Sequence, residues 1–255
     1  MKKQEDDAVL VVLIRTICGT YLGKWGSRQV TMQISTPESP INHKKIERIM
    51  REHGLLSKRR SVNPYKNIPK ESNEIEIAEN ILRRRYAFDT LWPLRVFGTD
   101  ITFIRIAGNK WAYLSAVKDF CTREIVAHKV SLSPNTELVL ATLDSFATKV
   151  PLEARIGGLI HSDRGSTYTS KAYCNETRIL GLNVSMSRKG NCIDNAPTES
   201  FFGHMKDELP NTKNMTYEEL CKTMNEYIID HNTVRKQWHR EKMSPVEYRK
   251  HLLCS

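Results

Sequence analysis

The stretch from His161 to Lys206 constrains the fold more than any other part of the chain, because it links an acidic strand end to an acidic helix. Residues 157–162 form a short apolar run that predicts a strand, and a turn begins directly after Asp163. Pro197 suits the first turn of a helix, which places Glu199 about one turn inside it. The pattern therefore predicts an α/β unit in which two rigid elements each carry a carboxylate.

The predicted helix that carries Glu199 has two distinct faces when successive residues are placed 100° apart. Its apolar side chains share one arc, and Asn195, Glu199, Gly203 and Lys206 share the opposite arc. A carboxylate beside a glycine, followed by a lysine, suits a site that holds a metal while a phosphate backbone passes close by. Taken alone, such a helix is more often an ordinary amphipathic helix with solvated charges.

A third acid, Asp100, lies inside the strand predicted over residues 96–106. Burying an unpaired carboxylate is costly, so such an acid is normally paired with a cation or a metal. Carboxylates brought together repel one another unless a divalent ion neutralises them, and Mg²⁺ and Mn²⁺ prefer oxygen ligands. Asp100, Asp163 and Glu199 therefore predict a metal site.

The order and flanking motifs of these acids resemble a known superfamily. Asp, Asp, thirty-five residues and Glu is similar to the catalytic triad of DDE transposases and retroviral integrases, which share an RNase H-like fold. Longer motifs resemble the second reading frame (OrfB) of the bacterial insertion-sequence-three family: Thr99–Thr102, His161–Gly165, Ser185–Asn191 and Asp194–Phe202. The similarity extends from about Leu82 to Tyr248. The chain departs from the family's usual Trp, Gln and Tyr at Phe97, Thr167 and His231, and none of these departures removes a candidate ligand.

This resemblance implies an enzyme, a polynucleotidyl transferase that cleaves DNA at the ends of an insertion sequence and transfers the freed strand. Asp100, Asp163 and Glu199 would be its catalytic residues and its metal ligands, holding two Mg²⁺ ions for which Mn²⁺ can substitute. Four basic side chains would contact DNA phosphates: Arg164, Arg188, Lys189 and Lys206. The implied partners are element-end and target DNA, further copies of the chain on DNA, and an upstream-frame helix-turn-helix and leucine-zipper protein, present as a fusion or a complex.

The N-terminal part of the chain holds most of the excess positive charge. Residues 1–95 contain 18 basic side chains and 11 acidic ones, within a chain of net charge +10. Two short helices are predicted over residues 27–54, the second capped by Asn42 and ended by Gly54. Its outer face carries Lys44, Lys45, Arg48 and Arg51. Charge and periodicity fit a solvated helix as well as a DNA-reading helix, and the family resemblance favours DNA contact.

The remaining pattern predicts an RNase H-like mixed five-stranded sheet with flanking helices, in the order β-β-β-α-β-α-β-α, plus a small N-terminal all-α domain. The expected domains are a helical, helix-turn-helix-like DNA-binding segment (1–60), a linker and connecting helix (61–95), an integrase-type catalytic core (96–210) and a C-terminal helical tail packed on the core's edge (211–255). Within that tail, Trp238 is interpreted as a core residue.

Several other features narrow the function. The six cysteines contain no Cys-x-x-Cys pair, so a zinc site is not expected. Without a signal peptide or a membrane span, we expect a bacterial cytoplasmic protein that joins the nucleoid when bound to DNA. Asp119 is the main rival to Asp100 or Asp163 and is interpreted as a cap or turn residue, because the resemblance gives it no catalytic role. His161 could be a general base but is interpreted as a packing or supporting residue.

Two alternatives to a transposase stay open at this level. One is an RNase H-like nuclease, such as a resolvase, that cuts DNA without joining it. The other is a regulator without catalytic activity that binds DNA through its basic N-terminal helix.

Overall fold

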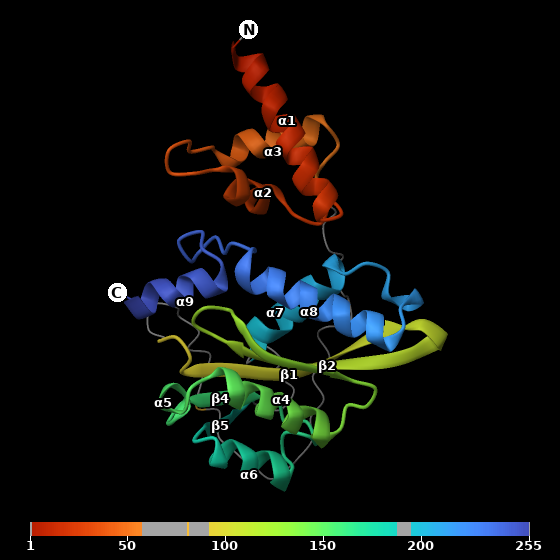
Figure 1. Ribbon diagram of the computed structural model, residues 1–255, viewed down its shortest axis with the longest axis vertical. Coiled ribbons are helices and arrows are strands. Elements are labelled where there is room, and N and C mark those ends of the chain that lie inside the picture. The colour runs from red at the N-terminus through yellow and green to blue at the C-terminus, as the bar shows by residue number, and fades with distance from the viewer. Residues whose placement is uncertain (1, 58–80, 82–91, 188–194, 255) are drawn as a thin grey trace.

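The computed structural model describes residues 2–57, 81, 92–187 and 195–254. Figure 1 shows a helical body at the N-terminal end and, beneath it, a sheet with helices on both faces. The predicted linker and connecting helix therefore lie almost wholly outside the described residues. Within the described ranges, no helix combines the length and apolar character needed to cross a membrane.

The sheet has five strands in the order β3-β2-β1-β4-β5, and its mixed five-stranded architecture agrees with the prediction. The strands are β1 (Val96–Ile106), β2 (Lys110–Asp119), β3 (Ile125–Ser131), β4 (Leu159–Ser162) and β5 (Asn183–Met186). β1, β2 and β3 form an antiparallel meander, whereas β4 runs parallel to β1 and β5 parallel to β4. The parallel pairing matters for function because it brings the end of β4 beside the middle of β1.

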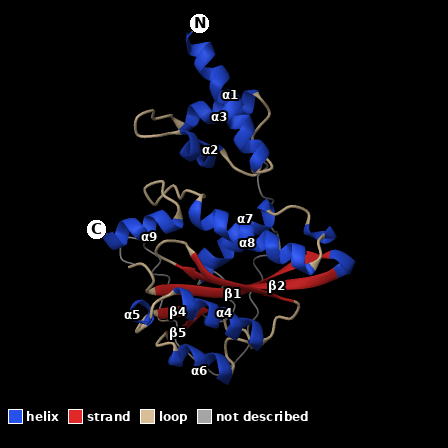
Figure 2. Cartoon of the chain, viewed as in Figure 1, coloured by secondary structure: helices blue, strands red, loops and turns tan. Residues whose placement is uncertain are grey.

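One face of the sheet is covered by α4 (Thr136–Lys149) and α6 (Lys171–Ile179), as Figure 2 shows. Their apolar side chains form a buried cluster with those of the strands, including Phe97, Val117, Leu143, Phe146 and Ile160. The strand predicted over residues 157–162 begins later, at Leu159. Gly157 adopts φ +72°, a conformation that does not continue a strand, and it follows the helical turn α5 (Leu152–Arg155).

The other face is covered by α7 (Ala196–Glu208) and α8 (Tyr217–Thr233). A second buried cluster joins them to the sheet and includes Leu114, Phe201, Met205, Leu220 and Met224. The terminal helix α9 (Pro245–Cys254) packs against α8. The C-terminal tail therefore covers a face of the core, not its edge, because the apolar side of α8 needs a broad surface to bury.

The N-terminal body consists of α1 (Lys2–Thr20), α2 (Ser27–Ile34) and α3 (His43–Glu52) around its own apolar cluster. The predicted ends of α3 are confirmed. The Asn42 side chain accepts from the Lys44 amide, and Gly54 adopts φ +67° while the Leu55 amide donates to the Met50 carbonyl at 2.7 Å.

This body contacts the segment that follows α8. Gln33 donates to the Val234 carbonyl and Lys236 donates to the Met32 carbonyl, each at 3.0 Å. Arg28 lies over the Trp238 ring, 5.3 Å from its centroid. Trp238, interpreted from sequence as a core residue, is only partly buried at this junction. Its apolar ring serves contacts between two regions that are distant in the chain.

Candidate active site

Asp100 lies in the middle of β1 with its side chain directed toward the α7 face of the sheet. Strand alternation puts it on the same side as Ile104 and Ile106, which pack in the cluster under α7. The side chain is half-buried, and its Oδ1 accepts a hydrogen bond from the Ile101 amide at 2.8 Å. The fold therefore holds a carboxylate inside the sheet.

Asp163 follows the last residue of β4 and is exposed. The parallel register pairs Phe97 with Ile160 and Gly98 with His161. If this offset is extended by two residues, Asp163 lies opposite Asp100, on neighbouring strands that are about 4.8 Å apart. The Asp163 Oδ1 also accepts from the Gly165 amide at 2.9 Å, which restricts its rotation.

Glu199 lies near the start of α7 and is half-buried. Asn195 donates to the Thr99 carbonyl at 3.1 Å, and the Lys118 ammonium donates to the Pro197 carbonyl at 3.0 Å. These bonds attach the start of α7 to β1 and β2. A Cβ atom at Gly98 would lie 2.5 Å from the Thr198 Oγ1 and 2.2 Å from the Phe120 ring, so glycine permits the close approach. Glu199 is thereby mounted beside Asp100.

The pKa of Asp100 indicates that all three acids lie close together. Burial, followed by the charges of Asp163 and Glu199, raises the pKa of Asp100 to about 7, and the Ile101 amide and Lys206 act in the opposite direction. The three predicted carboxylates therefore share one region. In the arrangement seen, the described residues contain no group of three or more His, Cys, Asp or Glu side chains placed to hold a metal ion.

The residues behind the acids support them. His161 is fully buried, and its ring nitrogens lie 2.9 Å from the Ser185 Oγ and 3.0 Å from the Ser187 Oγ, so it joins β4 to β5 as the supporting interpretation predicts. Tyr168 is also buried, and burial followed by the charge of Asp100 raises the pKa of its hydroxyl. Neither side chain has the exposure that a general base needs.

Asp119, the rival acid, has a structural role. Its side chain is fully buried, and its Oδ2 accepts from the Thr122 hydroxyl at 2.6 Å and from the Thr122 amide at 3.1 Å. These bonds close the turn between β2 and β3. The expected turn role is therefore confirmed.

The basic residues predicted to contact DNA lie in different surroundings. Lys206 is exposed on α7, with its ammonium 4.3 Å from the centroid of the exposed Phe103 ring. Arg164, directly after Asp163, donates to the Ser187 carbonyl at 2.9 Å. Arg188 and Lys189 lie outside the described residues. Two of the four therefore border the acids.

The basic face of α3 contains ion pairs. Asp7 of α1 pairs with Lys45 at 2.9 Å and with Arg48 at 2.6 Å, and Arg51 pairs with a glutamate of its own helix. Lys44 is exposed, with no ion pair in the part of the chain that the structure describes. A phosphate would therefore compete with acids for three of these four cations.

Lys118 is a supporting residue that sequence reasoning did not single out. It is 5% exposed and, through the Pro197 carbonyl, fixes the helix that carries Glu199. A lysine directly after the largely apolar residues 112–117 is a usable signal, because a buried ammonium requires acceptors. The sequence pattern does not reveal that its acceptor lies in α7.

Known protein families match the N-terminal body and the sheet with its helices separately. An integrase core domain family matches residues 92–192, a second integrase core domain family matches residues 199–253, and an HTH-like domain family matches residues 4–61. Together they cover both the sheet with its helices and the N-terminal body.

Two curated relatives cover most of the chain. A transposase-like protein of Haemophilus influenzae is 39% identical over 213 residues, which are 82% of this chain and 93% of the relative. The putative transposase InsK for insertion sequence element IS150 of Escherichia coli is 33% identical over 230 residues, 89% of this chain and 78% of the relative.

Among solved structures, a chain of the simian T-cell lymphotropic virus intasome, solved in complex with a PP2A regulatory subunit, superposes with a TM-score of 0.51. The match covers 88% of this chain and 70% of that chain at 13% sequence identity. This likeness concerns the fold alone.

Proposed function

The chain belongs to the insertion-sequence-three family of DDE transposases, and we propose which of its residues carry out the reaction. Transposases of this kind are polynucleotidyl transferases that act on DNA when an insertion sequence moves. We propose that Asp100, Asp163 and Glu199 are the catalytic residues. The observation that carries this proposal is the parallel register of β1 and β4, which aligns Asp163 with Asp100 beside the start of α7.

We propose that the same three acids bind Mg²⁺, with Mn²⁺ as a substitute, and that two ions complete the site. When bound, such ions activate the attacking hydroxyl or water and stabilise the leaving 3′-oxygen. The donor set fits this role, because all three side chains offer oxygen ligands. The raised pKa of Asp100 also supports it, since a cation would offset the repulsion between these carboxylates.

The chain's own residues would prepare the site for its ions. The amides of Ile101 and Gly165 each hold one oxygen of an aspartate, at 2.8 Å and 2.9 Å. The hydrogen bonds of Asn195 and Lys118 hold the helix that carries the glutamate. These bonds would hold the strands and the helix that carry the three carboxylates before an ion binds.

The basic side chains near the acids would position the DNA strand. We propose that Lys206 and Arg164, together with Arg188 and Lys189, contact phosphates and do not read bases. We further propose that the outer face of α3, with Lys44, Lys45, Arg48 and Arg51, contacts the element ends. For the last three residues, DNA would replace the carboxylates that now pair with them.

We propose that the wider organisation is residues 1–60 for DNA binding, 61–95 as connection, 96–210 for catalysis and 211–255 as the covering tail. We propose that the chain acts as a homo-oligomer on DNA, as a fusion or complex with the upstream-frame protein, and in the nucleoid of a bacterial cytoplasm.

The decisive test is Asp163→Asn in an assay with labelled element-end DNA and Mg²⁺ or Mn²⁺. We expect cleavage and strand transfer to fall by at least about 10³-fold while DNA binding is kept, because a catalytic ligand is lost and the exposed position keeps the fold intact. Asp144→Asn, at an exposed acid of α4, is the matched control and should act as the wild type does.

The same assay separates the alternatives. Cleavage without any joined product in the wild-type reaction would favour a nuclease of the resolvase type. Unchanged transposition in the cell after Asp163→Asn would instead favour a regulator that binds DNA without catalysis.

A further inference from the structure

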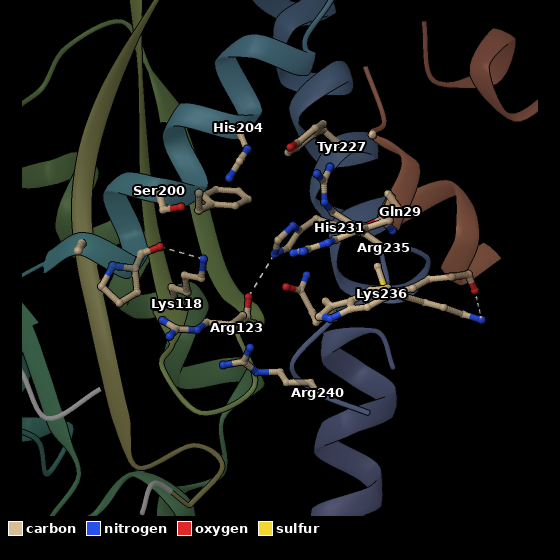
Figure 3. Close-up of a pocket in the computed structure, with 18 of the residues that line it drawn as sticks. Gln29, Lys118, Arg123, Ser200, His204, Tyr227, His231, Arg235, Lys236 and Arg240 are labelled. Carbon is tan, nitrogen blue, oxygen red and sulfur yellow. Dashed lines mark hydrogen bonds between the residues drawn. The ribbon is translucent and has the colours of Figure 1, made fainter. Parts of the chain in front are cut away.

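A cavity of about 870 Å³ lies beside α7 (Figure 3), and none of the three acids lines it. Its walls come from the start of α2, the end of β2 and the turn after it, the Ser200 and His204 side of α7, α8, and residues 235–240. The cavity therefore lies between the N-terminal body and the sheet with its helices. It is distinct from the proposed catalytic site.

The lining of this cavity is strongly basic. Among the described residues it includes no Asp or Glu, whereas six of its side chains are Lys or Arg: Arg28, Lys118, Arg123, Arg235, Lys236 and Arg240. Arg235 forms an ion pair with Glu208, which lies outside the lining. Figure 3 shows the cationic groups entering the same space from both sides. We call this region the basic cavity.

Lys118 is the most unusual group in the basic cavity. Its ammonium lies in a side chain that is 5% exposed, donates to the Pro197 carbonyl at 3.0 Å and is 5.1 Å from the Phe201 ring centroid. An ammonium carries three donors, so a single carbonyl does not exhaust its hydrogen-bonding capacity. Asp119, the next residue, hydrogen-bonds to Thr122 in the turn and does not line the cavity.

The surroundings make this positive charge unfavourable. Burial, then the charges of Arg123, Arg240 and Arg235, lowers the pKa of Lys118 well below its ordinary value. Arg240, itself 4% exposed, donates to the Cys121 carbonyl at 2.8 Å. The fold thus gathers several positive charges around one cavity. Their mutual repulsion destabilises the folded protein unless an anion binds among them.

We propose that the basic cavity binds phosphate groups, carried by a DNA strand or by a free nucleotide. Phosphate oxygens match the donors of Lys and Arg in charge and geometry. The cavity of about 870 Å³ is many times larger than the roughly 30 Å³ that one water molecule occupies in the liquid. It therefore has room for a phosphate group and for the sugar or base attached to it. The partly buried rings of Tyr227 and Trp238 also line the cavity and suit the flat faces of bases.

A bound phosphate would connect two parts of the protein. Arg28 comes from α2 in the N-terminal body, and Lys118 holds the first turn of α7. A phosphate held by both would therefore link the DNA-binding body to the helix that carries Glu199. This linkage goes beyond the proposed catalytic function, and phosphate binding does not depend on the three acids.

The test measures phosphate binding by the full chain in the presence of a chelator, so that metal-dependent DNA binding does not contribute. Titration calorimetry with inorganic phosphate and with adenosine monophosphate is compared with fluorescence anisotropy of a labelled single-stranded oligonucleotide. Lys118→Met and Arg28→Ala should each weaken binding by about tenfold, because each removes a charge-assisted hydrogen bond. Lys222→Met, which removes a charge from a side chain that is 79% exposed on α8, should change it by less than about twofold.

Binding within about twofold of wild type in both cavity variants would overturn the proposal, and so would an equal loss in Lys222→Met. Arg28 is exposed, so Arg28→Ala keeps the test valid if Lys118→Met does not fold. A larger loss of oligonucleotide binding than of small-anion binding in the two cavity variants identifies DNA as the source of the phosphate. A loss confined to the small anions identifies a free nucleotide. Asp163→Asn should bind phosphate as the wild type does, which separates this proposal from the catalytic one.

Discussion

The two sides of α7 carry opposite charges. On one side lie Asp100, Asp163 and Glu199, which we call the acidic site, and on the other lies the basic cavity around Lys118. Both are built on the same scaffold, since β1 carries Asp100 and the neighbouring β2 carries Lys118. The helix between them contacts each region through residues that are only one or two positions apart.

The comparison shows how a fold can prepare binding sites before any ligand arrives. Like charges help raise the pKa of Asp100 to about 7 in the acidic site, and like charges help lower the pKa of Lys118 in the basic cavity, in both cases after burial. In each region the protein accepts an electrostatic penalty that a ligand of opposite charge would remove. The acidic site thus suits cations and the basic cavity suits anions.

The largest effect is expected where α7 meets the sheet between these regions. Gly98→Ala would place a methyl group 2.2 Å from the buried Phe120 ring and 2.5 Å from the Thr198 Oγ1. We expect a loss of about 3 kcal/mol in the free energy of unfolding, because overpacking forces the helix outward. We also expect strand transfer to fall by more than about 100-fold, because Glu199 moves with the helix.

Denaturant unfolding and a strand-transfer assay check this prediction. Gly19→Ala in α1 is the matched control, because no atom outside its own stretch of helix lies within 4 Å of the position that its added methyl group would take, and alanine favours a helix. Wild-type activity in Gly98→Ala would show that α7 is not held by this contact.

A smaller effect is expected from Asp100→Asn in the metal-free protein. Because the pKa of Asp100 is raised from 3.8 to about 7, its contribution to stability is present below pH 3.8 and is lost as pH rises through about 7. Asparagine does not ionise. The full shift in the pKa would correspond to about 4 kcal/mol, but water screens this partly exposed side chain. The variant should therefore gain on the order of 1 kcal/mol of stability relative to wild type between pH 4 and pH 8.

Unfolding curves at the two pH values, recorded with a chelator, measure this difference. Asp144→Asn at an exposed position should show no such change. Adding Mg²⁺ to the wild type should remove most of the penalty at pH 8. A pH-independent difference between Asp100→Asn and wild type would contradict the shared acidic site.

The smallest effect is expected from replacing Lys118, the buried cation of the basic cavity. The pKa of Lys118 is lowered, so its contribution to stability is present above the ordinary value of 10.5 and is lost as pH falls through the lowered pKa. Lys118→Met should therefore be favoured relative to wild type at neutral pH, and this advantage should shrink toward pH 10 in unfolding curves recorded across that range. The sign is opposite to that of Asp100→Asn, and parallel pH responses in the two variants would refute the comparison.

Local signals in the sequence are sufficient for the elements that carry the acids. Pro197 and the apolar spacing of Phe201 and Met205 predict α7 and its buried side, and the apolar run around Asp100 predicts β1. Capping residues predict both ends of α3. These features depend on backbone conformation and periodicity, which neighbouring residues determine.

Contacts between segments that are distant in the chain are harder to predict from the sequence. The size and apolar character of Trp238 predict a core position, yet the ring lies at the junction with the N-terminal body. The predicted start of β4 is too early because Gly157 adopts φ +72°, and glycine accepts this conformation as readily as that of a strand. Strand pairing and contacts between domains determine where β4 begins and where Trp238 lies. The spacing of residues within a short stretch does not reveal either.

The class of the protein, the order of its strands and helices, and the three acids proposed for catalysis can all be read from the chain alone, because motifs and periodicity are properties of short stretches. Two findings required the folded arrangement: Lys118 supports the helix of Glu199, and six basic side chains line one cavity. Those residues come from segments far apart in the chain. Their charges acquire a common meaning only when burial brings them together and excludes the water that would otherwise screen them.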